Sequence, residues 1–518
     1  MTTDPRVRLL AGIDTAEVGD VVRLLDDPTV RVTGDVSAWR HQVILYTLVD
    51  LLSRVFRRLD LAVDAGTPAA DGLPPGGATV ADRLNAIRQH APLAPLPASE
   101  HPTLIVHVGG GSGPADLHVD ASEWQSYLGS RPSRLEPPRL DSAVGSVVAA
   151  CHAGARICSM LLADVLEPSD VDDEVYTSAL TYRASCDPID DAEPLPIGPL
   201  DTVLVGAGSV GGGAAYTMAY EPNLAGQLVA CDPQTLDDTN PYRSILATVG
   251  GALAHESKCD SIARVLAHHT DLTVDVQAMT ITDWESRQPA PPTLPLVLVA
   301  VDTRESRELV QDALPLDVVN AAVGTDLVAV SGHRTGTGPC MCCLHMPEVL
   351  DAASIKNRLI ADATGIAQPR VNELRVRRVP LDEVTLRAVE RHRDLKPGAL
   401  AHHAGATLDN LYTADILYGE TKVQTDTGVT VAVAAPFVTA LAGALLAGEA
   451  FKRSTSGLHT YALGVDGPGI QYRENPYLPR HGHLDPHIPR ADICLCRSVR
   501  RLRHLAAAHS LELTDLTT

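Results

Sequence analysis

The sequence predicts an α/β protein built around a mainly parallel sheet. From residue 200 onward, short apolar runs alternate with helical patterns, which is the order expected of parallel strands joined by crossover helices. One of these runs, residues 203–205, leads directly into a glycine-rich turn. Earlier in the chain, a strand pattern at 103–108 and a small-residue helix at 142–165 indicate a second α/β region. Together these observations predict a Rossmann-like, doubly wound sheet preceded by a degenerate α/β N-terminal domain.

The composition narrows the class of function. The chain has 518 residues, of which 42 are Lys or Arg and 64 are Asp or Glu, so its formal net charge is −22. This acidic balance argues against a surface for nucleic acid or for an anionic membrane. No early segment has the basic and apolar regions of a secretory signal, and no apolar run reaches the roughly 18 residues of a membrane span. We therefore expect a cytoplasmic protein with no nucleic-acid partner and no membrane partner.

The first 195 residues contain regular elements but no catalytic motif. Residues 43–59 have helical apolar spacing, and the strand at 103–108 runs into a glycine cluster at 109–113. That cluster lacks GxGxxG spacing and a following acid, so we interpret it as a plain turn and not as a phosphate loop. Acidic, proline-rich sequence at 187–199 predicts a linker to the next domain.

A glycine-rich loop is the feature around which the second half is organised. Gly206, Gly208 and Gly211 follow the apolar run 203–205 in the spacing GxGxxG. A strand, a glycine turn and a helix N-terminus form a cradle for phosphate, because glycine lets the backbone approach the anion and the free N–H groups point at it. Asp232 ends a second apolar run about 20 residues later, where its carboxylate can accept from a ribose hydroxyl. The pattern predicts a nucleotide site that includes these four residues.

A later strand places another acid at the same edge of the sheet. The apolar run 295–301 reads as a strand and ends in Asp302. In a parallel sheet the ligand lies at the carboxyl ends of the strands, which is where Gly206, Asp232 and Asp302 all fall. We therefore expect Asp302 to face the same ligand as the glycine loop.

These patterns divide the chain into three parts. Residues 1–195 form the N-terminal α/β domain, 196–453 a nucleotide-binding domain with a polar crossover excursion at 344–428, and 454–518 a tail. After the excursion the chain returns as a strand and a second small-residue helix, at a place similar to that of the helix at 142–165. We interpret this similarity as an internal repeat in which the N-terminal half has lost its nucleotide residues.

Further motifs follow the glycine loop and Asp232 in a fixed order. They are a polar loop with Asn240 and Arg243, a lysine helix with Lys258, an acidic segment with Asp302 and Arg307, and a CxxC with Cys340 and Cys343. This ordered set, over about residues 200–453, resembles the ubiquitin-activating-enzyme-like superfamily that includes ThiF, MoeB and HesA. The resemblance implies an ATP-dependent adenylyltransferase with Arg243, Lys258 and Asp302 as catalytic residues. It also implies that Asn240, Arg243 and Lys258 bind ATP and that Asp302 binds Mg²⁺.

These residue types suit the activation of a carboxylate by ATP. One anion has to attack the α-phosphate of another, so Arg243 and Lys258 would offset phosphate charge and Mg²⁺ on Asp302 would stabilise the pyrophosphate leaving group. A hydride-transferring enzyme has no need of this combination, which argues against an NAD(P)-dependent oxidoreductase. Taken singly, each charged residue has an ordinary alternative as part of a solvated face or a salt bridge.

Clustered cysteines predict a zinc site. Cys340 and Cys343 supply two ligands of a tetrahedral site, and in a reducing compartment such clusters favour metal over disulfides. The resemblance implies a second pair downstream, for which only Cys494 and Cys496 remain, at narrower spacing. We expect these four cysteines to bind structural zinc, and Cys342 is left unassigned. The alternative ligands are His345, His481, His483 and His487.

The segment between Cys343 and Cys494 contains no cysteine. The resemblance places the nucleophile of thioester-forming members in this segment. The nearest candidate, Cys342, lies inside the metal motif, and Cys186 lies in the linker. We therefore expect the chemistry to stop at the acyl-adenylate or to pass to a thiol on another protein.

The resemblance implies adenylation of the C-terminal carboxylate of a ubiquitin-like or sulfur-carrier protein. The alternatives are a ThiF-like peptide-binding or peptide-activating partner in a modified-peptide pathway, and an NAD(P)-dependent oxidoreductase. Because family members act as dimers or as fused active and inactive halves, we expect a homodimer or a pseudo-dimer within one chain. Residues 39–45 faintly resemble the family segment that lends an arginine to the partner's ATP site, which makes Arg40 a candidate.

Overall fold

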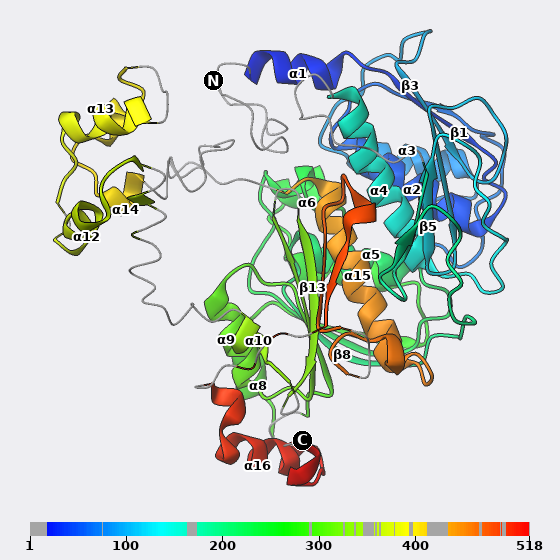
Figure 1. Cartoon of the computed structure of the whole chain (residues 1–518). Coiled ribbons are helices and arrows are strands. Elements are labelled where there is room, and N and C mark those ends of the chain that lie inside the picture. The colour runs from blue at the N-terminus through cyan, green and yellow to red at the C-terminus, as the bar shows by residue number, and fades with distance from the viewer. Residues whose placement is uncertain are drawn as a thin grey trace. The chain divides into compact units, whose positions relative to one another are not determined.

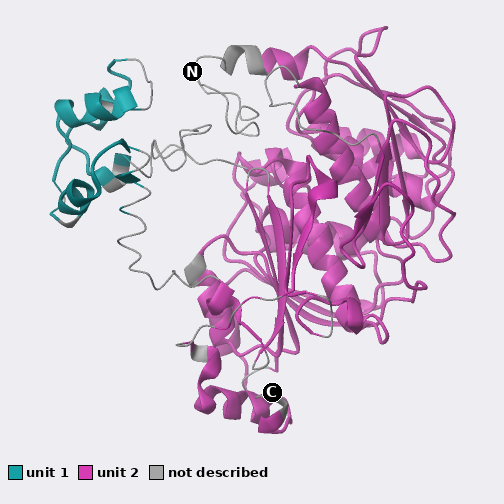
Figure 2. Cartoon of the chain, viewed as in Figure 1, with its two compact units in different colours: residues 1–19, 345–433 teal, residues 20–344, 434–518 magenta. Residues whose placement is uncertain are grey.

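The chain divides into two compact units, which are described separately (Figure 2). Residues 1–19 and 345–433 belong to one unit, and residues 20–344 and 434–518 to the other. The computed structural model describes residues 18–74, 76–162, 174–289, 293–324, 327–335, 338–344, 357, 360–361, 364–377, 379–392, 397–411, 434–465, 469–486, 488, 490 and 494–516. The larger unit contains two sheets, which we call the N-terminal half and the C-terminal half.

The N-terminal half is built on a seven-stranded sheet. Its order is β2 (Leu59–Ala62), β1 (Val30–Gly34), β3 (Leu104–Val108), β4 (Leu117–Ser122), β5 (Gln125–Gly129), β6 (Glu174–Ser178) and β7 (Ala184–Ser185). The first four strands in this order are parallel, and the last three are antiparallel. β3 confirms the strand predicted at 103–108, and the α/β character of this region is as expected.

The C-terminal half is built on an eight-stranded sheet. Its order is β10 (Leu272–Gln277), β9 (Gly226–Cys231), β8 (Leu200–Val205), β11 (Leu296–Val299), β12 (Asp317–Val323), β13 (Val328–Arg334), β14 (Gln471–Glu474) and β15 (His483–Asp485). The strands from β10 to β12 are parallel, and those from β13 on are antiparallel. β11 is buried at all four positions, as expected of a parallel strand covered on both faces. The predicted Rossmann-like, mainly parallel sheet is confirmed.

The two sheets repeat one topology. The first strand in sequence lies inside each sheet, β1 between β2 and β3, and β8 between β9 and β11. Each sheet also ends in three antiparallel strands, with a long helix placed before the second of them. The C-terminal half has one further parallel strand, β10. The N-terminal half is therefore a shortened copy of the C-terminal half.

Four helices from the two halves pack on one another between the sheets (Figure 1). α2 (Trp39–Ser53) packs on α4 (Ala143–Leu161), α4 on α15 (Pro436–Ser454), and α15 on α5 (Ser209–Tyr220). α4 is long and apolar enough to cross a membrane by length and composition, but 83% of its apolar window is buried inside the fold. Small residues bring α5 and α15 close, since a Cβ on Gly213 would lie 3.0 Å from the Cα of Ala440.

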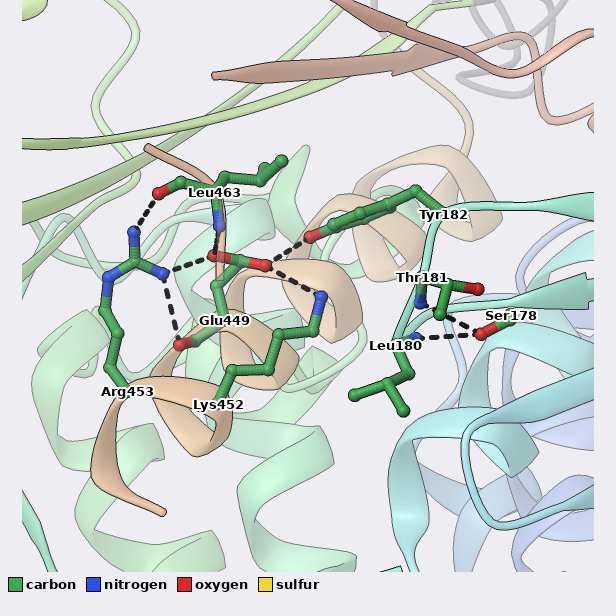
Figure 3. Close-up of polar contacts among 8 residues, drawn as sticks. All are labelled: Ser178, Leu180, Thr181, Tyr182, Glu449, Lys452, Arg453 and Leu463. Atoms are coloured by element: carbon green, nitrogen blue, oxygen red, sulfur yellow. Dashed lines mark hydrogen bonds and ion pairs between the residues drawn. The ribbon is translucent and has the colours of Figure 1, made fainter. Parts of the chain in front are cut away.

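A buried charged cluster at the end of α15 also joins the two halves (Figure 3). Glu449, which is fully buried, accepts hydrogen bonds from Tyr182 of the N-terminal half at 2.7 Å and from Lys452 at 2.8 Å. Arg453 and the Leu463 N–H also donate to this carboxylate. Burial alone would raise the pKa of Glu449, but Lys452 and Arg453 lower it to about 2. The buried carboxylate of Glu449 therefore accepts four hydrogen bonds, two on each oxygen.

The remaining helices cover the sheets or form the smaller unit. In the larger unit they are α3 (Val80–His90), α6 (Val249–Leu253), α7 (Lys258–Leu266), α8 (Ile281–Ser286), α9 (Arg304–Asp312), α10 (Met341–Leu344) and α16 (Val499–Ala508). α1 spans Val18–Asp26. The smaller unit contains α12 (Gln368–Val376), α13 (Glu383–His392) and α14 (Leu408–Leu411) around its own apolar core. The strand expected after residue 428 lies outside the described residues.

Candidate functional site

The glycine loop joins β8 to α5. Gly206 has φ +96°, and a Cβ there would lie 2.6 Å from the carbonyl oxygen of Ala300, so the turn requires glycine. A Cβ on Gly211 would overlap the carbonyl of Gly206. At Gly208, the N-cap of α5, no atom lies within 4 Å of the Cβ position. The loop is thus closed against the sheet and open at the start of a 12-residue helix, where N–H groups attract an anion.

Asp232 is fixed beside this loop. It directly follows β9 and is 6% exposed. One carboxylate oxygen accepts from the Ala207 N–H at 2.7 Å and the other from the Gln234 N–H at 2.8 Å. Since β9, β8 and β11 are adjacent and parallel, Asp232, the glycine loop and Asp302 all lie at one edge of the sheet.

Lys258 is a buried cation at the start of α7. The residue is 8% exposed, and its Nζ donates to the side-chain oxygen of Gln234 at 2.7 Å. None of the carboxylates in the described ranges forms an ion pair with Lys258. A buried ammonium with a neutral partner is costly, so the site favours an anionic ligand.

The loop with Asn240 and Arg243 supplies a second cation. Asn240 is 3% exposed and donates to Asp237 at 2.6 Å. The Nε of Arg243 is buried and has no hydrogen-bond partner within the described part of the chain. Burial would raise the pKa of Asp237, but hydrogen bonds from Thr239, together with Arg243 and Lys258, lower it. Asp237 therefore stays ionised and holds Asn240.

Asp302 lies on the turn between β11 and α9. It is exposed, and none of the described side chains forms an ion pair with it. Arg307 holds the turn, since it donates to the carbonyls of Val301 at 2.8 Å and Asp302 at 3.3 Å. Its Nε donates to Asn320 of β12 at 3.0 Å. A free carboxylate on a braced turn has the right donor type for Mg²⁺.

Two of these supporting side chains were not predicted from the sequence. Gln234, which holds Lys258, and Asn320, which holds Arg307, are neutral residues outside any motif. Each carries a buried contact made between segments at least 13 positions apart. Gln234 lies shortly after β9, and Asn320 lies in the middle of β12, so their positions share no sequence signal.

The four predicted cysteines lie together. The Sγ atoms of Cys340, Cys343, Cys494 and Cys496 are all within 4.8 Å of one another. Three of the separations are 3.4 Å (Cys340 to Cys494), 3.6 Å (Cys343 to Cys496) and 3.8 Å (Cys340 to Cys343). Sulfurs bound tetrahedrally about 2.3 Å from zinc are about 3.8 Å apart. The cluster therefore fits a tetrahedral zinc ion.

Cys342, His481 and His483 are not part of this cluster. His483 pairs instead with Asp485 at 2.8 Å. His345 and His487 lie outside the described residues. The narrow spacing of Cys494 and Cys496 is compatible with the site because Cys494 directly precedes a 3₁₀ turn, Leu495–Arg497, and Cys496 lies within it.

The cluster fastens the C-terminal tail to the sheet domain. Cys343 lies on α10, which contacts α9, and Cys340 directly precedes that helix. Cys494 and Cys496 precede α16. Close by, Arg501 of α16 pairs with Asp312 of α9 at 2.5 Å. Leu502 and Leu505 pack with Leu314 and Leu316. The cysteine site therefore has the position of a structural element and not of an edge facing the ligand.

Most other cysteines are buried and unreactive. Burial raises the pKa of Cys158 and Cys231 to about 12 and that of Cys259 to about 11. Cys186 is exposed, and Cys342 is partly exposed. Thiolates are the reactive form, so these two are the accessible thiols of the described chain.

Arg40 lies within its own half. Its Nε is 3.7 Å from Asp120 of β4, and the side chain is 16% exposed. His41 reaches the same carboxylate at 3.1 Å. Arg40 therefore contacts an acid of the N-terminal half.

Comparisons with known proteins give distant similarities. No protein-family model matches the chain. The uncharacterised protein y4jF of Sinorhizobium fredii (strain NBRC 101917 / NGR234) is 27% identical over 413 residues, which cover 76% of this chain and 75% of y4jF.

Among solved structures, E. coli MccB aligns at 15% identity with a TM-score of 0.34, covering 58% of this chain and 66% of MccB. E. coli MccB with MccA-N7isoASN aligns at 15% identity with a TM-score of 0.31, covering 57% of this chain and 66% of that chain. The match thus spans slightly less than two thirds of MccB.

Proposed function

We propose that this chain is an ATP-dependent adenylyltransferase that activates the C-terminal carboxylate of a small protein or peptide. The observation that carries the proposal is the pairing of two cations, the buried Lys258 and the half-buried Arg243, with a glycine loop at one sheet edge. Neither cation forms a salt bridge with a carboxylate among the described residues, although both act electrostatically on Asp237. A polyphosphate supplies the missing negative charge.

In the proposed reaction, a carboxylate oxygen of the substrate attacks the α-phosphorus of ATP, and the bond from that phosphorus to the leaving pyrophosphate breaks. The Gly206–Gly211 loop and the N-terminus of α5 hold phosphate oxygens, and Asp232 orients the ribose. Lys258 and Arg243 offset the charge that builds up on the transferred group. Asp302 would hold Mg²⁺, which stabilises the pyrophosphate when bound.

The zinc proposed for the four cysteines has a structural role. Its ligands hold the tail and contribute no group to the ligand edge. A structural zinc site has four protein ligands and no open position, which matches the four-sulfur set.

The substrate class rests on the family resemblance, which implies a ubiquitin-like or sulfur-carrier protein ending in glycine. A modified-peptide precursor is the second candidate, since a peptide C-terminus presents the same carboxylate. We infer that the two halves act as a pseudo-dimer within one chain, because the inactive half repeats the topology of the active half.

The absence of a nucleophilic cysteine between Cys343 and Cys494 indicates that the product is released as the acyl-adenylate or passed to an external thiol. Mixing the protein with MgATP and substrate and running gels with and without reductant tests this point. We expect no reductant-sensitive adduct. An adduct that persists in Cys342→Ala and is lost in Cys186→Ala would place the nucleophile on Cys186.

The decisive experiment is ATP–pyrophosphate exchange with purified full-length protein. Small proteins and peptides with a free C-terminal glycine should stimulate exchange, and the same molecules with an amidated C-terminus should not. Exchange that is indifferent to the C-terminal carboxylate would contradict the proposed function.

A further inference from the structure

Arg54 joins the N-terminal half to the loop that carries Arg243. It caps the C-terminus of α2 and is 2% exposed. Its guanidinium donates to three backbone carbonyls of the C-terminal half, those of Pro241, Ile245 (2.8 Å) and Ala247 (3.0 Å). The other N–H groups point at Asp50, at 2.8 Å. All five guanidinium donors therefore have an acceptor.

Another helix holds the Arg243 carbonyl, which lies between the carbonyls that Arg54 contacts. The Arg243 carbonyl accepts from the Thr439 hydroxyl of α15 at 2.8 Å. Every second carbonyl from 241 to 247 is thus bound by a side chain from outside the loop. Because buried carbonyls need partners, this loop conformation depends on Arg54 and Thr439.

Arg54 is the only one of these donors supplied by the N-terminal half. The loop's own contacts are short-range turns, such as Arg243 N–H to the Asn240 carbonyl and Ala247 N–H to the Ser244 carbonyl. Such turns fix local shape but do not set where the loop lies against α5 and α7. A buried arginine that reaches three carbonyls does set that position.

We propose that Arg54 is a positioning residue for the nucleotide site, and that the N-terminal half thereby acts as a built-in activator of the C-terminal half. In the sequence, Arg243 lies between Pro241 and Ile245, whose carbonyls accept hydrogen bonds from Arg54. A shift of residues 241–247 therefore moves Arg243 relative to Lys258. This consequence for catalysis rests on the proposed function, whereas the effect on the loop does not.

Lysine cannot replace arginine here. An ammonium has three donors on one atom, while the guanidinium fork reaches three separate carbonyls and Asp50. Arg54→Lys keeps a positive charge beside the Asp50 carboxylate but loses part of the carbonyl contacts. This variant therefore separates loop positioning from the ion pair.

Tyr182→Phe is the matched control. Tyr182 is also buried and also joins the halves, but its hydroxyl contacts Glu449 at the end of α15 and not the loop. Both variants lose buried hydrogen bonds across the same helical layer. Only Arg54→Lys should affect the nucleotide loop.

Two measurements on the full-length chain test the proposal. In hydrogen–deuterium exchange, the amides of 243–247 should exchange about tenfold faster in Arg54→Lys than in the parent, and at the parental rate in Tyr182→Phe. In calorimetry with MgATP as the probe, Arg54→Lys should raise Kd about tenfold and Tyr182→Phe less than about threefold.

Each other outcome decides the question. Parental loop exchange in a folded Arg54→Lys, or equal loosening of the loop in Tyr182→Phe, would overturn the positioning role. If the parent does not bind MgATP, the proposed function fails, and the exchange result alone decides the role of Arg54. If Arg54→Lys does not fold, Asp50→Asn/Arg54→Gln, which removes both charges of the pair, is measured with the same expectations.

Discussion

The carboxyl edges of the two sheets share a backbone and differ in chemistry. A glycine lies at the end of the first strand in each sheet. Gly34 is the last residue of β1 and has φ +149°, and Gly206 directly follows β8 and has φ +96°. A Cβ on Gly34 would run into the Val108 carbonyl of β3, just as one on Gly206 would meet Ala300 beyond β11. Since β3 and β11 hold equivalent places, the same turn requires glycine in both halves.

Side chains of the N-terminal half occupy its own edge. The His41 Nδ1–H donates to the Asp35 carbonyl at 2.8 Å, while Nε2 lies 3.1 Å from Asp120. Arg40 approaches the same Asp120, so the cations of this edge have an acid. At the other edge, Lys258 donates to Gln234 and forms no salt bridge with any of the described residues. The two edges therefore share one topology and differ in their charged side chains, and under the proposed function the cations without a salt bridge mark the edge that binds the nucleotide.

The largest expected effect is the loss of ATP–pyrophosphate exchange when a cation of the C-terminal edge is removed. Lys258→Ala and Arg243→Ala should each lower ATP–pyrophosphate exchange by about 10²–10³-fold, because a preorganised charge contact contributes roughly 3–4 kcal/mol to the transition state. The control is Arg31→Ala, which removes a cation of β1 that pairs with Asp60 at 2.6 Å. Equal exchange in all three variants would mean that unpaired cations do not mark the site.

A second asymmetry is the cysteine cluster, which only the C-terminal half carries among the described residues. Metal analysis should find about one zinc per chain. Cys340→Ser and Cys494→Ser should each lower the zinc content and reduce the unfolding temperature by several degrees, because the tail loses its anchor. Cys342→Ser should change neither, and full zinc retention in the Cys494 variant would show that the ligand set is wrong.

Unlike Arg54, Glu221 joins the halves away from the nucleotide loop, so its effect should appear in stability and not in ATP–pyrophosphate exchange. Glu221 of the C-terminal half accepts from Ser142 and Ala143 of the N-terminal half at 3.1 and 2.8 Å. Burial raises its pKa from 4.5 to about 7. Its contribution to stability is therefore present below about pH 4.5 and is lost as the pH rises through about 7.

Glu221→Gln removes this pH dependence. The difference in unfolding free energy between variant and parent should shift by about 3 kcal/mol in favour of the variant from pH 4 to pH 8, since one pKa unit corresponds to about 1.4 kcal/mol. Denaturant unfolding at both pH values measures the difference. The same stability gap at pH 4 and pH 8 would contradict the raised pKa.

The smallest expected effect compares matched carboxylates at the two edges. Asp232→Asn should weaken MgATP binding about tenfold, because the carboxylate holds the glycine loop and is placed for the ribose. Asp120→Asn should leave MgATP affinity unchanged and lower only the unfolding temperature, since its partners are His41 and Arg40. Loss of MgATP affinity in Asp120→Asn would indicate that the N-terminal edge also takes part in binding.

Local patterns predicted the elements at the ligand edge. β8, the glycine loop and α5 are contiguous, so their order is visible in residues 203–213, and the cysteine spacings identified the four clustered sulfurs. α2 begins at Trp39 and not at residue 43. The sequence pattern missed this first turn because the polar His41 and Gln42 interrupt the apolar spacing, although tertiary contacts bury both. The strands β4 to β7 are short and were not predicted individually, although the internal repeat was expected.

Contacts between distant segments left no local signal. Arg54 meets Pro241 across 187 positions, and Thr439 meets Arg243 across 196. A buried arginine at a helix end looks like a solvated one in the sequence, because only tertiary packing removes it from water. The sequence therefore predicted which side chains gather at the carboxyl edge of the sheet better than which side chains hold them in place.

The insertion of the smaller unit between β13 and α15 has a consequence for synthesis on the ribosome. β13 is paired on one side by β12 as soon as it is made, but its other partner, β14, begins only at Gln471. At about 5–20 residues per second, translation of the intervening segment takes on the order of ten seconds. During that time β13 has an open edge that can pair with another nascent chain. The newborn protein should therefore need a chaperone until its last strands emerge.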